Sequence, residues 1–204
     1  GPFRSRSVAR FGETGHKAIY ALVSLITLGG AIFFFIKAGR PDEAAWLWNL
    51  PYLRVVCALV LMLVAVPLVV FGFVQQSPTG MMQLSFEPKP IHKITRHPVN
   101  MGLAFFALAH CVALGYLTAI ALFGSIFIVG FLGAYHQDMR KTKALGEEFA
   151  AFKRKTSVFP FAAIVSRKTD FRFGDLNKVL LAVSLLVYAA LILFHETFFG
   201  AGVF

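Results

Sequence analysis

Residues 93–111 decide the fold, and they read Lys-Ile-Thr-Arg-His-Pro-Val-Asn-Met-Gly-Leu-Ala-Phe-Phe-Ala-Leu-Ala-His-Cys. Basic residues, ending with Arg96 and His97, stand just before an apolar run. Pro98 lies between the two parts, and a helix tolerates proline best in its first turn. The pattern therefore predicts an apolar helix over 99–114 with positive charge at its start.

The composition of the whole chain is that of an integral membrane protein. Of its 204 residues, 57% are hydrophobic, 15% are charged and 23 are Phe. The mean hydropathy is +0.70. Soluble domains are nearer half apolar, with about a quarter of their residues charged. Both cysteines lie inside apolar runs, so no disulfide framework is predicted.

Five apolar runs predict an all-α integral membrane protein, organised as one domain over residues 1–204. The predicted spans cover about 18–38, 52–74, 99–114, 119–135 and 179–195. Only four residues separate the third run from the fourth, which predicts an antiparallel hairpin. The apolar stretch 156–165 is too short to span and is interrupted by proline, so we expect it to lie at the membrane interface on the cytoplasmic side.

The basic residues are distributed asymmetrically about these spans. Seventeen of the twenty Lys and Arg residues fall in 1–17, 75–98 and 136–178. By the positive-inside rule these three segments lie on the cytoplasmic side, and the C-terminus lies outside. The net charge of +10 is thus explained by topology and by attraction to anionic membrane lipids, with no need for a nucleic-acid partner.

His110 is the first candidate for a functional residue. It lies thirteen residues after His97, roughly 20 Å along a helix axis. An ionisable group inside a hydrocarbon layer about 30 Å thick is costly, so it is a functional-site hypothesis by default. Neutral imidazole is the commonest metal-binding side chain, which favours a metal or haem ligand. The alternative is a packing histidine that is hydrogen-bonded to a neighbouring span.

Arg96 and His97 form the second candidate site. They lie at the membrane surface near a helix start, where backbone N–H groups and the helix dipole favour an anion. They are candidates to bind a haem propionate, a phosphate or a carboxylate. The alternative is an interfacial pair without a ligand.

The remaining histidines are less informative. His16, His92 and His136 lie at the cytoplasmic edge, where we expect them to be solvated. His195 lies beside Glu196 near the outer end of the last predicted span, as an ion-pair partner or part of a site remote from the others.

Two short motifs resemble the NnrU family of membrane proteins: Ile-Thr-Arg-His-Pro at 94–98 and Leu-Ala-His at 108–110. Gly-Glu at 12–13 and Tyr-Ala-Leu-Val-Ser-Leu at 20–25 fit the start of the same domain. Gly-Glu-Glu-Phe at 146–149 and Thr-Ser-Val-Phe-Pro-Phe-Ala-Ala-Ile at 156–164 are more specifically similar to the 15-cis-zeta-carotene isomerases, the plant and cyanobacterial branch. The similarity covers nearly the whole chain.

The resemblance implies a haem b isomerase acting on a lipid-soluble polyene, in a bacterial inner membrane or a plastid membrane. His110 matches one of two histidines that hold the iron, and Arg96 and His97 are assigned to cofactor binding. The other ligand belongs to a helix upstream of residue 1, which makes six spans in the intact protein. Those isomerases carry a cysteine three residues before the histidine, whereas here Ala107 holds that position and Cys111 follows the histidine.

Two other classes of function remain open. Membrane methyltransferases of the isoprenylcysteine carboxyl and phospholipid types also place Arg-His-Pro before a span. In that interpretation Arg96, His97, Asp138 and Glu148 would face S-adenosylmethionine, and His110 would be incidental. The acidic pair of those enzymes is incomplete here, because Gln137 precedes Asp138. The third interpretation is an NnrU-type haem-binding or accessory subunit of a membrane complex linked to nitrogen-oxide metabolism.

Overall fold

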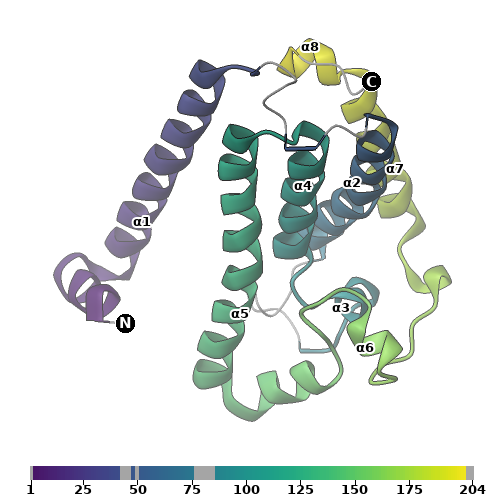
Figure 1. The fold of residues 1–204 in the computed structure, drawn as a ribbon. Coiled ribbons are helices and arrows are strands. Elements are labelled where there is room, and N and C mark those ends of the chain that lie inside the picture. The colour runs from purple at the N-terminus through teal and green to yellow at the C-terminus, as the bar shows by residue number, and fades with distance from the viewer. Residues whose placement is uncertain (1, 42–46, 49–50, 76–85, 201–204) are drawn as a thin grey trace. The chain divides into compact units, whose positions relative to one another are not determined.

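The computed structural model describes residues 2–41, 47–48, 51–75 and 86–200 (Figure 1). All regular secondary structure within these ranges is helical, which confirms the predicted all-α class for them. The chain divides into two compact units, Gly1–Ala45 and Trp46–Phe204. The elements are α1 (Pro2–Ala38), α2 (Pro51–Val74), α3 (Pro90–Ile94), α4 (Pro98–Leu114), α5 (Leu117–Arg154), α6 (Ala162–Val165), η2 (Phe173–Asp175), α7 (Lys178–Leu193) and α8 (His195–Phe199).

The first unit is built on α1. This helix begins well before the predicted start at residue 18, and its axis is kinked at Gly12, where φ is 70°. The part from Arg6 to Ala38 is long and apolar enough to cross a membrane. Large apolar side chains along it are exposed, as expected of a helix that faces lipid.

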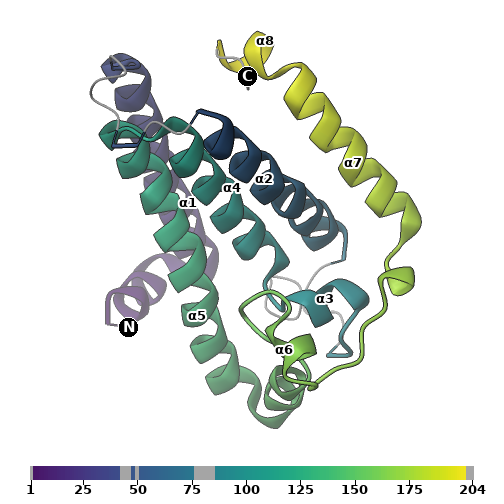
Figure 2. The ribbon, with the colours of Figure 1, turned by 45° about the vertical axis from the view of Figure 1, so that its right-hand side comes forward.

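In the second unit, four helices lie side by side in the order α5, α4, α2, α7 (Figures 1 and 2). The α2–α4 contact is close because Gly102 has no side chain. A Cβ added at Gly102 would lie 2.6 Å from Val69 Cγ2 and 2.9 Å from the Ala65 carbonyl oxygen. The predicted hairpin is also confirmed, since α4 ends at Leu114, α5 begins at Leu117 and the two helices pack together.

Three described helices are long and apolar enough to span a bilayer: Arg6–Ala38, Tyr52–Val74 and Leu117–Arg154. They indicate a membrane protein. Helices α4 and α7 are apolar but have only 17 and 16 residues. The count of five spans and their sidedness therefore stay predictions. The predicted end of the fourth span near 135 is not a helix end, because α5 continues through Arg154.

One end of the second unit is formed by the polar part of α5 together with α3 and α6. Gly146 turns α5 sharply, with φ 59° and ψ −132°, a conformation that glycine adopts without the cost that a Cβ brings. The turn directs Phe149 and Phe152 inward, where both are fully buried. α6 packs on α3, beyond the start of α4 (Figures 1 and 2). We call this end the basic end, because residues 86–98 and 136–178 carry most of the positive charge of the unit.

Candidate functional site

The candidate residues lie at opposite ends of α4. His97 is the residue that precedes the helix, and His110 lies one turn before its end at Leu114. At about 1.5 Å per residue, the two histidines are roughly 20 Å apart along the helix axis. Two separate regions must therefore be considered.

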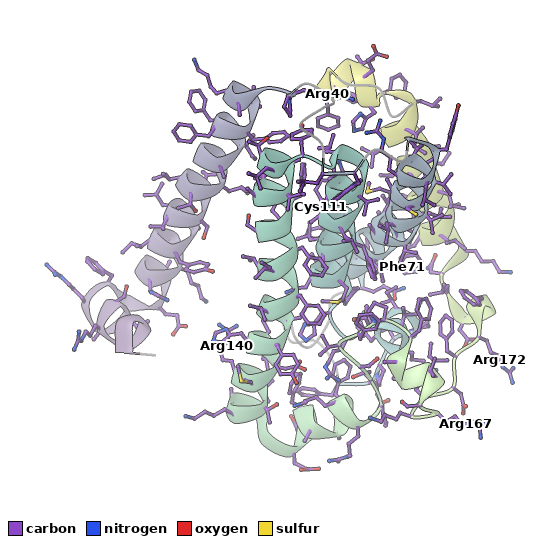
Figure 3. The ribbon with its side chains drawn as sticks, in the orientation of Figure 1. Arg40, Phe71, Cys111, Arg140, Arg167 and Arg172 are labelled. Atoms are coloured by element: carbon purple, nitrogen blue, oxygen red, sulfur yellow. The ribbon has the colours of Figure 1, made fainter. Side chains whose placement is uncertain are left out.

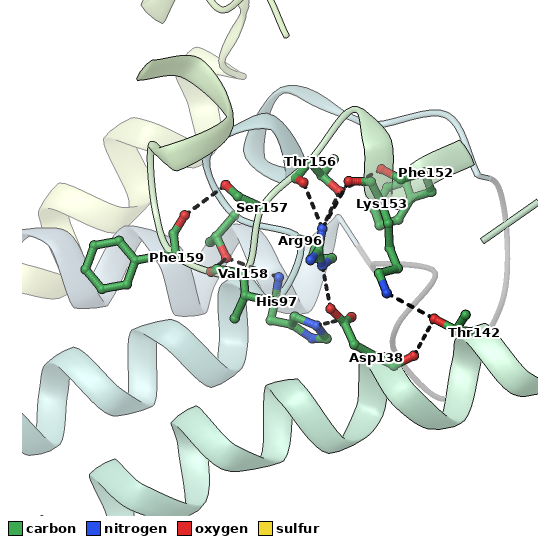
Figure 4. A network of polar contacts seen from close by, with 11 residues as sticks. Arg96, His97, Asp138, Thr142, Phe152, Lys153, Thr156, Ser157, Val158 and Phe159 are labelled. Atoms are coloured by element: carbon green, nitrogen blue, oxygen red, sulfur yellow. Dashed lines mark hydrogen bonds and ion pairs between the residues drawn. The ribbon is translucent and has the colours of Figure 1, made fainter. Parts of the chain in front are cut away.

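The region at the basic end is organised by an ion pair between Arg96 and Asp138 (Figure 4). The Arg96 guanidinium donates from Nε to Asp138 Oδ2 at 2.8 Å and from Nη1 to the Thr156 carbonyl at 2.8 Å. Weaker bonds run to Thr156 Oγ1 and the Lys153 carbonyl, both at 3.3 Å. Arg96 and Asp138 are 8% and 5% exposed. The network links the start of α4 to both halves of α5.

Asp138 also receives a hydrogen bond from His97. The His97 Nε2 atom lies 2.7 Å from Asp138 Oδ1, which requires the proton to be on Nε2 if the carboxylate is ionised. The other ring nitrogen, Nδ1, is buried and has no hydrogen-bond partner among the described residues. Burial opposes ionisation of Asp138, but its hydrogen bonds and electrostatic interactions with His97 and Arg96 outweigh burial, so its pKa lies below the ordinary value.

The segment before α4 also pairs with the chain that follows α5. The Arg96 backbone N–H donates to the Ser157 carbonyl at 2.8 Å, and the Phe161 N–H donates to the Ile94 carbonyl at 2.8 Å. Between them, the Thr95 hydroxyl donates to the Val158 carbonyl at 2.7 Å. Thr95 is fully buried. These bonds fix the apolar stretch 156–165 against residues 94–96, which lead into α4.

The expectation that His92 is solvated is wrong, because the residue is only 1% exposed. Its Nε2–H donates to the Gln75 carbonyl at 2.9 Å, and its Nδ1 accepts from the Lys89 N–H at 3.3 Å. Burial lowers the pKa of His92 to about 4, although the Gln75 hydrogen bond opposes this. The imidazole is thus a neutral core residue, which packs edge-on against Phe152.

The second region surrounds His110. Its Nδ1 donates to the Phe106 carbonyl one turn earlier, at 2.8 Å. Its ring stacks on Phe123 of α5, with centroids 4.6 Å apart, and contacts the Phe106 ring at 4.2 Å. The side chain is half-buried. Because Nδ1 is used by the helix, Nε2 is left as the nitrogen that can bind a ligand.

Other predicted positions can also be located. His195 begins α8, and its ring lies against that of Phe199, with centroids 5.0 Å apart. His136 is exposed as expected, and His16 is half-buried with Nδ1 3.1 Å from the Ser7 hydroxyl. Ala107, which holds the position of the cysteine in the similar isomerases, is fully buried. No group of three or more metal-ligating side chains is assembled in the described ranges.

Asp138 has a larger role in this site than the sequence indicated. It is the acid that joins Arg96 and His97, and the available signal was a lone carboxylate shortly after an apolar run, on the same predicted side as the Arg-His-Pro motif. The assignment of Arg96, His97 and His110 to cofactor binding stays a prediction. What the structure adds is that the first two already have protein partners.

A comparison with known families identifies the chain. The profile described as NnrU protein matches residues 1–203. The chain belongs to the NnrU protein family. It is 29% identical over 161 residues to the chloroplastic 15-cis-zeta-carotene isomerase of Arabidopsis thaliana, which covers 75% of this chain and 42% of that protein. It is 28% identical over 162 residues to the enzyme of the same name from Zea mays, covering 76% and 43%.

This NnrU-family chain thus spans less than half the length of the curated relatives that it matches. No solved structure matches it significantly.

Proposed function

We propose that this NnrU-family protein is a haem-dependent cis–trans isomerase of a carotenoid of the 15-cis-zeta-carotene type, with His110 as a ligand of haem b iron. The observation that carries the proposal is the hydrogen bond from His110 Nδ1 to the Phe106 carbonyl. Metal-binding histidines commonly donate their other ring N–H to a carbonyl, which fixes the tautomer and raises the basicity of the ligating nitrogen. The similarity to two isomerases supplies the reaction type.

The residues around His110 would suit one protein ligand to haem iron. A haem needs one or two protein ligands, fewer than the three or four of a zinc site, so a single ordered imidazole suffices. The His110 side chain is half-buried, not fully enclosed. Phe106 and Phe123 offer apolar faces beside it, of the kind that pack against a macrocycle.

The residues of this chain would bind and orient the haem and would exclude water from it. The His110 imidazole, fixed in one tautomer, would bind the iron. Phe106 and Phe123 would keep water from the imidazole. When bound, the haem supplies an iron that can lower the bond order of a polyene double bond and so permit rotation. A carotenoid is wholly apolar and would reach the protein from the lipid, past the exposed apolar faces of the helices.

Arg96 and His97 have a different place in this proposal. They lie roughly 20 Å from His110 along the axis of α4, at the opposite end of the helix. They also form an internal network with Asp138. His110 is therefore the proposed iron ligand, and Arg96 and His97 connect the start of α4 to α5 at the basic end.

The test is an absorption spectrum of the full-length protein, purified from a host supplied with haem, before and after reduction with dithionite. We expect a Soret band that sharpens on reduction, is lost or shifted in His110→Ala, and is retained in His136→Ala. His136 is the matched control, because it is an exposed histidine on α5. Turnover of 15-cis-zeta-carotene by the reduced protein would be measured next.

Each result decides between the functions considered. A Soret band unaffected by His110→Ala would remove His110 as the ligand. Absence of a Soret band would refute the haem isomerase and direct the search to S-adenosylmethionine at Arg96 and His97. Bound haem without turnover would favour a haem-binding subunit of a membrane complex.

A further inference from the structure

The segment from Phe159 to Phe173 exposes apolar and basic side chains together. Phe159, Val165 and Phe173 are 60%, 81% and 73% exposed. The exposed basic residues between them are Arg167, Lys168 and Arg172. Exposed large apolar side chains that alternate with basic ones in one short segment are typical of a contact with a membrane interface. We call these six residues the α6 surface.

The exposure is not that of a loosely attached loop. The segment is tied to the end of α3 by the hydrogen bond from the Phe161 N–H to the Ile94 carbonyl, at 2.8 Å. Further along, Lys93 Nζ donates to the Asp170 carbonyl at 2.9 Å. The inward side of the same segment is packed, with Ala163 fully buried. One side is therefore fixed to the protein, and the other is left uncovered by the described residues.

The α6 surface lies at the level where apolar helices begin. The segment leads into α7, whose first residue is Lys178, and α6 packs on α3, which ends at Ile94, shortly before α4 begins at Pro98. Figure 3 shows Arg167 and Arg172 pointing outward on one side of the fold, away from Arg140 on α5. In a membrane, this position is that of the lipid headgroups next to the ends of the spanning helices.

We propose that the α6 surface inserts into the interfacial layer of the bilayer and binds the headgroups of anionic phospholipids. Its apolar side chains fit the boundary between headgroups and acyl chains, as in interfacial amphipathic segments. Its arginines fit phosphate, which guanidinium groups bind with two parallel hydrogen bonds. Residues 159–178 contain four basic and two acidic residues, so the segment has a net positive charge. A lipid surface adjacent to the spanning helices explains both kinds of exposed side chain.

The experiment is hydrogen–deuterium exchange of the full-length protein in nanodiscs of phosphatidylcholine alone or with phosphatidylglycerol. The peptide to follow covers residues 169–174. We expect its exchange to be slower in the anionic nanodiscs by on the order of fivefold. Raising the salt to about 1 M, which shortens the screening length to about 3 Å, should remove most of the difference in the unmodified protein.

Two variants of equal charge change locate the effect. Arg167→Gln/Arg172→Gln should abolish the lipid dependence, whereas Arg140→Gln/Lys143→Gln, on the exposed side of α5, should retain it. Equal exchange in the two lipids, or a lipid dependence that survives Arg167→Gln/Arg172→Gln, would overturn the proposal. Exchange of residues 169–174 that becomes slower with rising protein concentration in detergent would also overturn the proposal. A second copy of the chain would then cover the α6 surface. The salt measurement keeps the test valid if a variant is unstable.

Discussion

Replacement of Asp138 by asparagine tests the ion pair that holds the basic end together. The carboxylate accepts from Arg96 Nε at 2.8 Å and from His97 Nε2 at 2.7 Å. An amide has one acceptor oxygen, so its NH2 group would face one of these two donors. Breaking a buried ion pair by removing one partner costs about 3–5 kcal/mol. Arg96 keeps its bonds to Thr156 and Lys153, which places the expected loss near the lower end, about 3 kcal/mol.

The matched control is Glu147→Gln on the same helix. Glu147 pairs with Arg154 at 2.6 Å, but the two side chains are 80% and 64% exposed. Exposed pairs contribute about 0–1 kcal/mol, so this variant should unfold almost like the parent protein. The two substitutions make the same chemical change and differ in burial.

Unfolding can be followed in one fixed detergent by the reaction of Cys57 and Cys111 with a fluorogenic thiol reagent, because both thiols are free and half-buried. A loss of about 3 kcal/mol corresponds to a Tm lower by roughly 6–12 °C for a chain of this size. The double variant Arg96→Met/Asp138→Leu should be more stable than Asp138→Asn, since it leaves no unpaired buried charge. A Tm change in Asp138→Asn no larger than in Glu147→Gln would refute the reasoning.

Two further predictions concern the core. The pKa of His92 is lowered from 6.5 to about 4, so the unfolded chain takes up a proton below pH 6.5 that the folded chain does not take up until about pH 4. Stability should therefore fall by roughly 3 kcal/mol between these pH values, and His92→Gln should remove that part of the pH dependence in unfolding curves. Gly102→Ala should destabilise by about 1–3 kcal/mol because its Cβ would clash with Val69. Gly124→Ala, whose nearest contact is 3.8 Å away, should be neutral or stabilising in the same thermal assay, and equal effects of the two would contradict this packing argument.

The apolar helices were predictable because their signal is local. The predicted run 52–74 matches α2, 99–114 matches α4, and the short break after Leu114 predicted the hairpin with α5. Helix ends in polar sequence were less predictable. The start of α1 at Pro2, well before residue 18, is the example, whereas the Ala, Leu, Glu and Lys residues over 138–155 indicate helix, and α5 does continue to Arg154.

The network at the basic end could be predicted only in part. Arg96 and His97 were recognisable as a charged pair near a helix start, but their shared partner Asp138 is more than forty residues away. The burial of His92 had no local signal, since it depends on Phe152 and on the carbonyl of Gln75, which come from other parts of the chain. Contacts between distant segments leave no periodic pattern to detect.

The separation of the two candidate regions has a consequence for how variants should behave. The Arg-His-Pro motif that marks the family resemblance lies at the start of α4, at the basic end. The proposed iron ligand lies at the far end of α4. The orientation of His110 is set by Phe106 within the same helix, so it does not require the Arg96–Asp138 pair. If His110 binds haem as proposed, loss of that pair should therefore lower stability while the folded fraction keeps the haem spectrum. Loss of His110 should change the spectrum with a much smaller change in Tm. If instead both substitutions changed the spectrum equally, the two ends of α4 would form one coupled site, and Arg96 and His97 would belong to the cofactor after all.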